Sequence, residues 1–364
     1  MHSSEPKHRV IFIDLLRAIA VIQMVQGHTV YVLLAKNYMN EELPVFALWH
    51  FLRGMTAPIF LFTAGTVFTY LFSSVRKPFL ENYRVKKGIK RAFLLLFIGY
   101  MLRYPSWTIV DFSQVTPEAW QSFFIVDVLQ LIGLSLLILL FILFTVEKLK
   151  LNNLAAFVTV SAIIFIASPF IDSINWIEIL PAPFAAYFFS GSGSLFPIFP
   201  WAGFVISGAV LGCYLAQNPM VFKSSRFSIW LGIIGVIFLL AAYFSELIMD
   251  ASSINIFNPQ VSPDTIFLRI GFVLALTSLV SYISLKVEHI PYLIILIGRN
   301  TLLIYVVHLI ILYGSVWSLG LGAILGSSLT GWQSFFASIV MIALMTLMVL
   351  IIHRFKIRNK ELVT

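Results

Sequence analysis

An arginine and a histidine lie eleven positions apart in a mostly apolar stretch near the N-terminus, RAIAVIQMVQGH, which runs from Arg17 to His28. On an α-helix, eleven residues make three turns plus about 20°, so the two side chains share one face and are separated by about 16 Å along the axis. A guanidinium suits a phosphate or carboxylate, and a histidine transfers protons near neutral pH. The pattern indicates proton-transfer chemistry on an anionic substrate. The structural alternative is that Arg17 pairs with Asp14 and that His28 bonds to a neighbouring helix.

The elements that must position this pair are membrane spans. Of the 364 residues, 60% are hydrophobic and 11% are charged, whereas soluble domains carry roughly 25% charged residues. The net charge of +8 comes from basic residues in short loops, which is a topology signal and not a sign of nucleic-acid binding. The single cysteine, Cys213, excludes a disulfide framework within the chain. We predict one all-α domain over residues 1–364, a polytopic helix bundle in the membrane.

Apolar runs of about 20 residues predict ten spans. They lie at 10–35, 46–75, 92–110, 121–146, 154–172, 196–217, 228–249, 264–285, 291–317 and 333–352. The first run is too long for a signal-peptide core and is expected to stay in the mature protein. If the N-terminus is cytoplasmic, 18 of the 24 Lys and Arg residues fall on the cytoplasmic side. We therefore expect both termini in the cytoplasm.

Several stretches resemble one enzyme family. FIDLLRAIAVIQMVQGH is similar to the first span of bacterial members of the heparan-α-glucosaminide N-acetyltransferase-like family. It is also similar to the first span of related O-acyltransferases of surface polysaccharides, which share the pattern of an arginine, ten residues and a histidine. GMTAPIFLFTAGTVF (54–68), FPIFPWAGFVISGAVLG (196–212) and LIGRNTLLIYVVHL (296–309) agree with the first family, and VDVLQLIGLSLL (126–137) agrees more weakly.

The resemblance implies that an acyl-CoA is held at the cytoplasmic face and that its acyl group passes to an acceptor on the outer side. It implies that His28 is the catalytic histidine and that Arg17 is a residue of the CoA side. The lysosomal member has its catalytic histidine after the first span, which makes His50 a second candidate.

Polar residues in or beside the other spans are further candidates. His50 and Arg53 stand at the outer start of the second span, and Arg103 ends the third. Each of them either binds an acceptor or forms an interfacial contact at a helix end. Asp127 lies inside the fourth span, where a carboxylate usually has a partner, here expected to be a histidine or an arginine. The predicted catalytic residues are thus His28, His50 and Asp127, and the predicted acceptor-binding residues are Arg53 and Arg103.

The segment GRNTLLIYVVHL places Arg299 and His308 on opposite sides of an ideal helix, unless the helix breaks near the preceding glycine. A basic cluster around Lys87 and Arg91 suits CoA phosphates, and its alternative role is to set topology or contact lipid headgroups. The predicted acyl-CoA-binding set is Arg17, Lys87, Arg91, Arg299 and His308.

The predicted function is therefore that of an acyl-CoA-dependent acyltransferase in the bacterial inner membrane. It moves an acyl group, expected to be acetyl, to a hydroxyl or amine of an extracytoplasmic acceptor, and the family implies a sugar or glycan. His28 acts as general base or is itself transiently acylated. We expect no metal and no nucleic acid, and the oligomeric state stays open between monomer and homodimer. The alternative is a secondary transporter of a small anion, with Arg17 and His28 as binding and proton-relay groups.

Overall fold

The computed structural model describes residues 10–252, 258–287 and 290–361, with side chains described up to residue 357. The described chain is built almost entirely of α-helices. The helices are α1 (Ile11–Leu33), α2 (Pro44–Ser73), α3 (Tyr83–Leu102), α4 (Pro117–Phe124), α5 (Val128–Lys148), α6 (Asn153–Asp172), α7 (Ala182–Ala185), α8 (Ile198–Gln217), α9 (Ser225–Ala251), α10 (Pro263–Lys286), α11 (Tyr292–Arg299), α12 (Thr301–Tyr313), α13 (Leu321–Leu325) and α14 (Gly331–Glu361). Two short strands, β1 (Gly314–Ser315) and β2 (Ser318–Leu319), pair antiparallel after α12.

Eight of the described helices are long and apolar enough to cross a membrane, namely α1, α2, α5, α6, α8, α9, α10 and α14. The pair α11 and α12, bent by 73° at its junction, makes a ninth if it counts as one broken span. The predicted polytopic all-α architecture is confirmed. The number of candidate spans is lower than the predicted ten because of α3. This helix is long enough to cross a membrane, but the basic cluster on its first half makes it too polar.

Four predicted spans differ clearly from the helices at their boundaries, and one of them, 333–352, lies within the longer α14. Helix α3 starts at Tyr83 and not near residue 92, because the Asn82 side chain caps it by accepting a 2.9 Å hydrogen bond from the Arg84 backbone N–H. The predicted span 121–146 divides into the short α4 and the long α5, which begins after Asp127. The predicted span 291–317 breaks at Asn300 and ends in the β1–β2 hairpin.

Contacts divide the chain into two units. One unit, here called the α8 unit, contains residues 61–105 and 111–286 among the described ones. The other, here called the α1 unit, contains residues 11–60, 106–110 and 287–361. Helix α2 contributes its first half to the α1 unit and its second half to the α8 unit.

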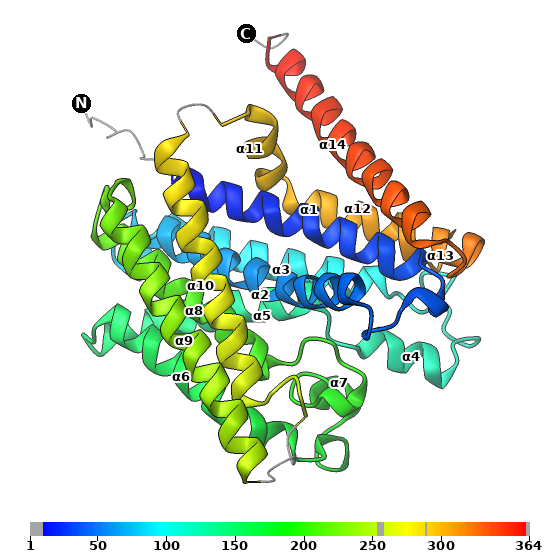
Figure 1. Ribbon diagram of the computed structural model, residues 1–364, viewed down its shortest axis with the longest axis horizontal. Helices are drawn as coiled ribbons and strands as arrows, with labels where there is room; N and C mark the ends of the chain where they lie inside the picture. Colours follow the sequence, from blue (N-terminus) through cyan, green and yellow to red (C-terminus); the bar gives the residue numbers. More distant parts are fainter. Residues whose placement is uncertain (1–9, 253–257, 288–289, 362–364) are drawn as a thin grey trace. The chain divides into compact units, whose positions relative to one another are not determined.

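Glycines bring helices into close contact in the α8 unit. A Cβ atom on Gly208 of α8 would lie 1.9 Å from the Phe62 carbonyl oxygen of α2, and one on Gly212 would lie 2.3 Å from that of Thr66. Such small residues let two helix backbones approach within a membrane, where apolar side chains gain little by leaving lipid. The long helices α9 and α10 of this unit also pack side by side (Figure 1).

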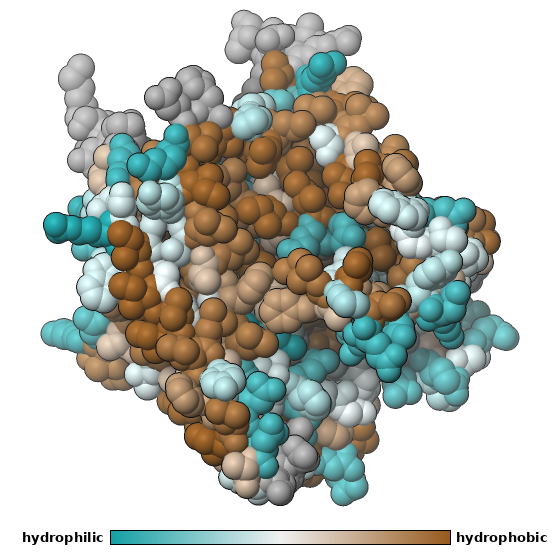
Figure 2. Space-filling view, in the orientation of Figure 1, coloured by the Kyte–Doolittle hydropathy of each residue, from teal (hydrophilic) through white to brown (hydrophobic). Residues whose placement is uncertain are grey.

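The surfaces of the peripheral helices are apolar. Exposed side chains include Trp230, Ile237 and Phe244 on α9, and Phe336 and Val340 on α14. In Figure 2 the surface over the α9–α10 pair and the surface over α14 are largely brown, the colour of hydrophobic residues. Large exposed apolar faces are what a helix presents to lipid. The chain is an integral membrane protein.

Candidate active site

In the α1 unit, α1 packs against α11, α12 and α14 (Figure 1). This packing brings together two histidines that are 280 positions apart in the sequence. The Nδ1 atom of His28 on α1 lies 3.0 Å from the Nε2 atom of His308 on α12, and the two ring planes are nearly parallel, 16° apart, with centroids separated by 5.3 Å. His308 is fully buried, whereas His28 keeps part of its surface accessible.

One backbone carbonyl sets the direction of the hydrogen bonds between these rings. The other ring nitrogen of His308, Nδ1, lies 2.8 Å from the carbonyl oxygen of Ile304. A carbonyl only accepts, so this nitrogen carries the hydrogen, and in a neutral ring Nε2 is then an acceptor. It follows that His28 donates through Nδ1 and that its Nε2 atom carries a lone pair. Within the described part of the chain, Nε2 of His28 has no hydrogen-bond partner, so it is available as a base.

Arg17 occupies the other end of the same helix pair. Its guanidinium donates a 3.1 Å hydrogen bond to the hydroxyl of Thr301, the first residue of α12, and lies 3.9 Å from the Asp14 carboxylate. Because Thr301 lies at Arg17 and His308 lies at His28, α12 runs beside α1 in the same direction. Both contacts of the structural alternative are therefore present: Arg17 is near Asp14, and His28 bonds to a second helix.

Aromatic rings surround the two histidines. Tyr313 meets the edge of the His28 ring at a centroid distance of 6.0 Å, and Tyr305 meets His308 at 5.7 Å. Tyr31 lies one turn after His28 on α1. The Arg53 guanidinium makes a cation–π contact with its ring, with the Cζ atom 4.1 Å from the ring centroid.

The second histidine candidate has a different environment. The Nδ1 atom of His50 lies 2.7 Å from the Glu41 carboxylate, and the two side chains are 46% and 70% exposed. An exposed histidine with an exposed carboxylate is a surface pair, which contributes little to stability. Arg299 is exposed as well, at the end of α11. The structure therefore brings His308, and not His50 or Arg299, together with His28.

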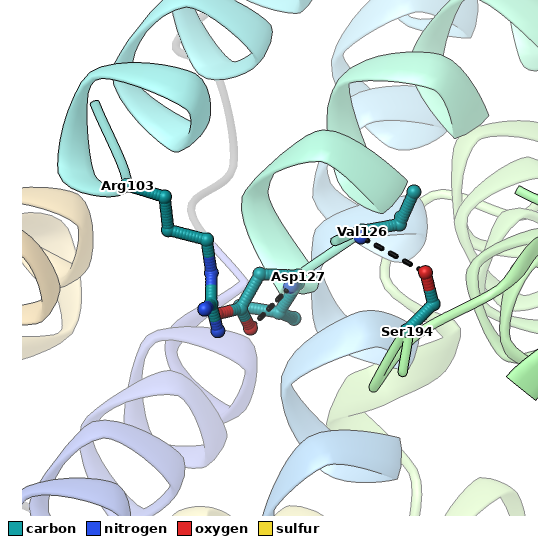
Figure 3. Close-up of polar contacts among 5 residues, drawn as sticks. Arg103, Val126, Asp127 and Ser194 are labelled. Carbon is teal, nitrogen blue, oxygen red and sulfur yellow. Dashed lines mark hydrogen bonds and ion pairs between the residues drawn. The ribbon is translucent and has the colours of Figure 1, made fainter. Parts of the chain in front are cut away.

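A second polar cluster lies in the α8 unit (Figure 3). The Arg103 guanidinium, just after α3, donates a 3.0 Å hydrogen bond to the Asp127 carboxylate, which also caps α5 by accepting from the Val128 N–H at 2.8 Å. The Ser194 hydroxyl accepts a 3.1 Å hydrogen bond from the Val126 N–H and so ties the loop before α8 to the same place. The expectation that Asp127 has an arginine partner is confirmed. The catalytic role of Asp127 and the acceptor-binding role of Arg103 stay predictions.

A pair of tyrosines connects the loop before α8 to helix α3. The hydroxyl of Tyr100 on α3 lies 2.8 Å from the hydroxyl of Tyr187, in the segment between α7 and α8. Burial raises the pKa of Tyr187, so its hydroxyl stays protonated and keeps a hydrogen to donate. The loop before α8 is thus held to α3 as well as to α5.

The predicted CoA-side residues Lys87 and Arg91 lie one turn apart on α3, and both are exposed. The Lys87 ammonium lies 4.7 Å from the centroid of the Tyr83 ring. Two cations on one exposed helix face suit a phosphate group, as predicted, and they belong to the α8 unit. Their joint action with Arg17, which lies in the α1 unit, stays a prediction.

Sequence reasoning missed three residues that contact Arg17, His28 or Arg53. Tyr31 lies three positions after His28, so helical periodicity was a signal for it. Thr301 starts a helix immediately after a break, where a hydroxyl is common, but nothing in the sequence connects it to Arg17. No local pattern points to Tyr313, because its contact with His28 depends on how α12 packs on α1.

Comparison with known families identifies the chain. The family model described as heparan-alpha-glucosaminide N-acetyltransferase, catalytic, matches residues 9–242, which is more than half of the chain. The matched range contains Arg17, His28 and Arg53, whereas His308 lies beyond it. No individual curated protein matches the chain. This integral membrane protein therefore belongs to the heparan-α-glucosaminide N-acetyltransferase family of membrane acetyltransferases.

Proposed function

We propose that this protein transfers an acetyl group from cytoplasmic acetyl-CoA to a hydroxyl or amine of a sugar or glycan on the outer side of the bacterial inner membrane. Membership of the acetyltransferase family supports the reaction class. The observation that carries the assignment of the base is the chain of contacts from His28 through His308 to the Ile304 carbonyl. A fixed tautomer with an accessible lone pair is what general-base catalysis needs.

In the direct route, the Nε2 atom of His28 accepts the proton of the acceptor hydroxyl or amine while that oxygen or nitrogen forms a bond to the thioester carbonyl carbon. The carbon–sulfur bond then breaks, and the departing CoA thiolate takes the proton from Nε2. While His28 is protonated, its Nδ1–H still donates to Nε2 of His308, and the Nδ1–H of His308 still donates to Ile304. The two contacts hold the ring in position throughout the transfer.

A covalent route uses the same atom. The Nε2 lone pair of His28 attacks the thioester carbonyl carbon, and CoA leaves as the thiolate. The acceptor then attacks the acetyl-imidazolium, the bond from the acetyl carbon to Nε2 breaks, and the freed Nε2 takes the acceptor's proton and passes it to the thiolate. The two routes differ in one observable. A radiolabelled acetyl group stays on the protein in the absence of acceptor only in the covalent route.

Arg17 is the residue of the α1 unit that we assign to the donor side, because its positive charge matches the phosphates of CoA. Arg17 lies eleven residues before His28 on α1, about 16 Å along the helix axis, so a long, flexible donor is needed to reach from one to the other. The thiol arm of CoA is long and flexible, as this separation requires. Arg299 and His308 were also predicted for the donor side, and we reassign His308 to the positioning of His28 because of their direct contact.

The test compares His28→Gln with His50→Ala in purified protein. We expect His28→Gln to retain its fold and to bind acetyl-CoA, but to lose acetyl transfer by roughly 10²–10⁴-fold, because glutamine cannot accept the proton. His50→Ala should remain active. Near-normal transfer by His28→Gln together with an inactive His50→Ala would place the chemistry at the surface pair instead.

A third arm of this experiment concerns His308. His308→Leu removes the acceptor for the Nδ1–H of His28. In His308→Gln, the side-chain amide oxygen can still accept a hydrogen bond from that Nδ1–H. We expect the glutamine variant to be at least about tenfold more active than the leucine variant. A tenfold rate difference corresponds to the free energy of about one hydrogen bond. Equal activity of the two variants would show that His308 does not position His28.

A further inference from the structure

Arg53 is a charged side chain for which the described part of the chain provides no counter-charge. Its guanidinium makes no ion pair or hydrogen bond with the described residues, and its Nε atom is buried without a partner. A buried donor without a partner loses the hydrogen bonds that it made with water, and the loss is larger when the group is charged. Intramembrane charges are normally paired or functional. The unused donors of Arg53 therefore need an explanation outside the described residues.

Neighbouring side chains hold this guanidinium in place. Its Cζ atom lies 4.1 Å from the centroid of Tyr31 and 5.9 Å from the centroid of Trp49. Trp49 is in turn fixed by a 3.1 Å hydrogen bond from its indole N–H to Gln26 on α1. Stacking covers the faces of a guanidinium and leaves its N–H groups pointing outward in the plane. Arg53 thus has a fixed orientation and free donors before any substrate arrives.

The same arginine adjoins the candidate base. Its Cγ atom would lie 3.2 Å from a Cβ atom added to Gly27, so the absence of a side chain at position 27 lets the stem pass close to α1 at the residue before His28. Tyr31, on whose ring the Arg53 guanidinium lies, follows His28 by one turn of α1. A permanently positive group beside a proton-accepting nitrogen suits a reaction in which an oxygen becomes negative.

We propose that Arg53 binds an anionic oxygen of the reacting complex beside His28, an inference that rests on the proposed acetyl transfer. Two sources supply such an oxygen. One is the former carbonyl oxygen of the thioester, which becomes an oxyanion when the acceptor attacks. The other is a fixed carboxylate or sulfate on the acceptor, next to the group that is acetylated. The planar edge of a guanidinium binds either of them through paired N–H donors.

The decisive variants are Arg53→Met, which keeps the stem against Gly27 and removes the donors, and Arg53→Lys, which keeps the charge without the planar fork. Lys36→Met is the matched control, because it removes one positive charge from an exposed position of the same unit. Acetyl transfer from acetyl-CoA is measured with glucosamine and with glucosamine 6-sulfate as the probe acceptors.

A loss of kcat by about 10²–10³-fold for both probes, with little change in KM, supports the oxyanion as the bound group. A rise in KM for glucosamine 6-sulfate alone supports a fixed anion on the acceptor. In either case Arg53→Lys should recover part of the activity. If Arg53→Met matches Lys36→Met on both probes, the proposal is wrong.

A binding experiment separates this proposal from acetyl transfer. Acetate is titrated into wild-type protein and Arg53→Met, and binding is followed by tryptophan fluorescence, with chloride at equal ionic strength as reference and Trp49→Phe to assign the signal. Acetate-specific quenching that requires Arg53 supports an anion site even if the wild type transfers no acetyl group to either probe. Equal quenching in both proteins, or none in the wild type, would overturn the Arg53 proposal without bearing on His28.

Discussion

The Ile304 carbonyl determines which nitrogen of His28 can accept a proton. It fixes the hydrogen on Nδ1 of His308, and His308 in turn fixes the hydrogen on Nδ1 of His28. Because Ile304 lies one turn before His308 on the same helix, this relation depends on regular α-helical geometry and on no flexible group. This chain of contacts orients the ring of His28. In other active sites, too, a hydrogen bond to one ring nitrogen of a histidine orients the other nitrogen.

Arg17 is the residue whose predicted role can be tested by binding alone. We expect Arg17→Ala to weaken acetyl-CoA binding by about 1.5–3 kcal/mol, the usual contribution of a hydrogen bond to a charged group. Calorimetry on detergent-solubilised protein measures this, with Lys36→Ala as the exposed control. If wild-type protein binds no acetyl-CoA at millimolar concentration, the anion transporter becomes the better hypothesis.

At the scale of elements, the break between α11 and α12 places Thr301 beside Arg17. Helix α11 ends at Arg299, and the chain bends by 73° before α12 begins at Thr301. Gly298 makes the close approach to α1 possible, because a Cβ atom there would lie 2.2 Å from the Asp14 carbonyl oxygen and 3.3 Å from the Ala18 N atom. Small residues on both helices therefore determine how deeply α11 packs on α1.

Gly298→Ala tests this packing. The added methyl group cannot fit without separating α11 from α1, so we expect a loss of about 1–3 kcal/mol in unfolding free energy, as for other overpacked sites. Thermal unfolding in detergent measures the loss. Gly54→Ala is the control, since a Cβ at that helical position would meet nothing within 4 Å. A melting temperature of Gly298→Ala equal to that of the control would show that α11 does not depend on this contact.

At the scale of the whole molecule, the loops on the two sides of the membrane differ in charge. The distribution of basic residues predicts that Lys87 is cytoplasmic and that Lys36 is on the outer side. This orientation places the basic cluster on α3 at the side where acetyl-CoA is available. It also places the end of α1 that carries His28 in the outer half of the membrane, closer to an extracytoplasmic acceptor.

Single-cysteine labelling tests the orientation. Cys213 is buried and is first replaced by alanine, after which cysteines are introduced singly at Lys36 and at Lys87. In intact cells, an impermeant maleimide should label the variant at position 36, and the variant at position 87 only after the membrane is opened. Labelling of both positions from the same side would contradict the predicted arrangement of α1 and α2.

The sequence by itself determined the features that follow from local pattern. Apolar runs gave most spans to within a few residues, and helical periodicity placed Arg17 and His28 on one face of α1. Asp127 was expected to pair with a histidine or arginine because an isolated charge in a membrane is costly, and its partner is Arg103. Helix starts were less predictable where a cap decided them, as Asn82 did for α3.

Only the tertiary structure decided which histidine meets His28. His50 was predicted as an alternative catalytic residue and His308 as a donor-side residue, and nothing in the local sequence separates an exposed histidine paired with Glu41 from a buried one on α12. The contact with His308 joins positions 280 residues apart, so it depends on how α12 packs against α1 and not on either helix alone. The same holds for Arg53, whose fixed orientation requires Tyr31 and Trp49 to converge from two helices. Periodicity assigns a side chain to a face, whereas packing determines what that face meets.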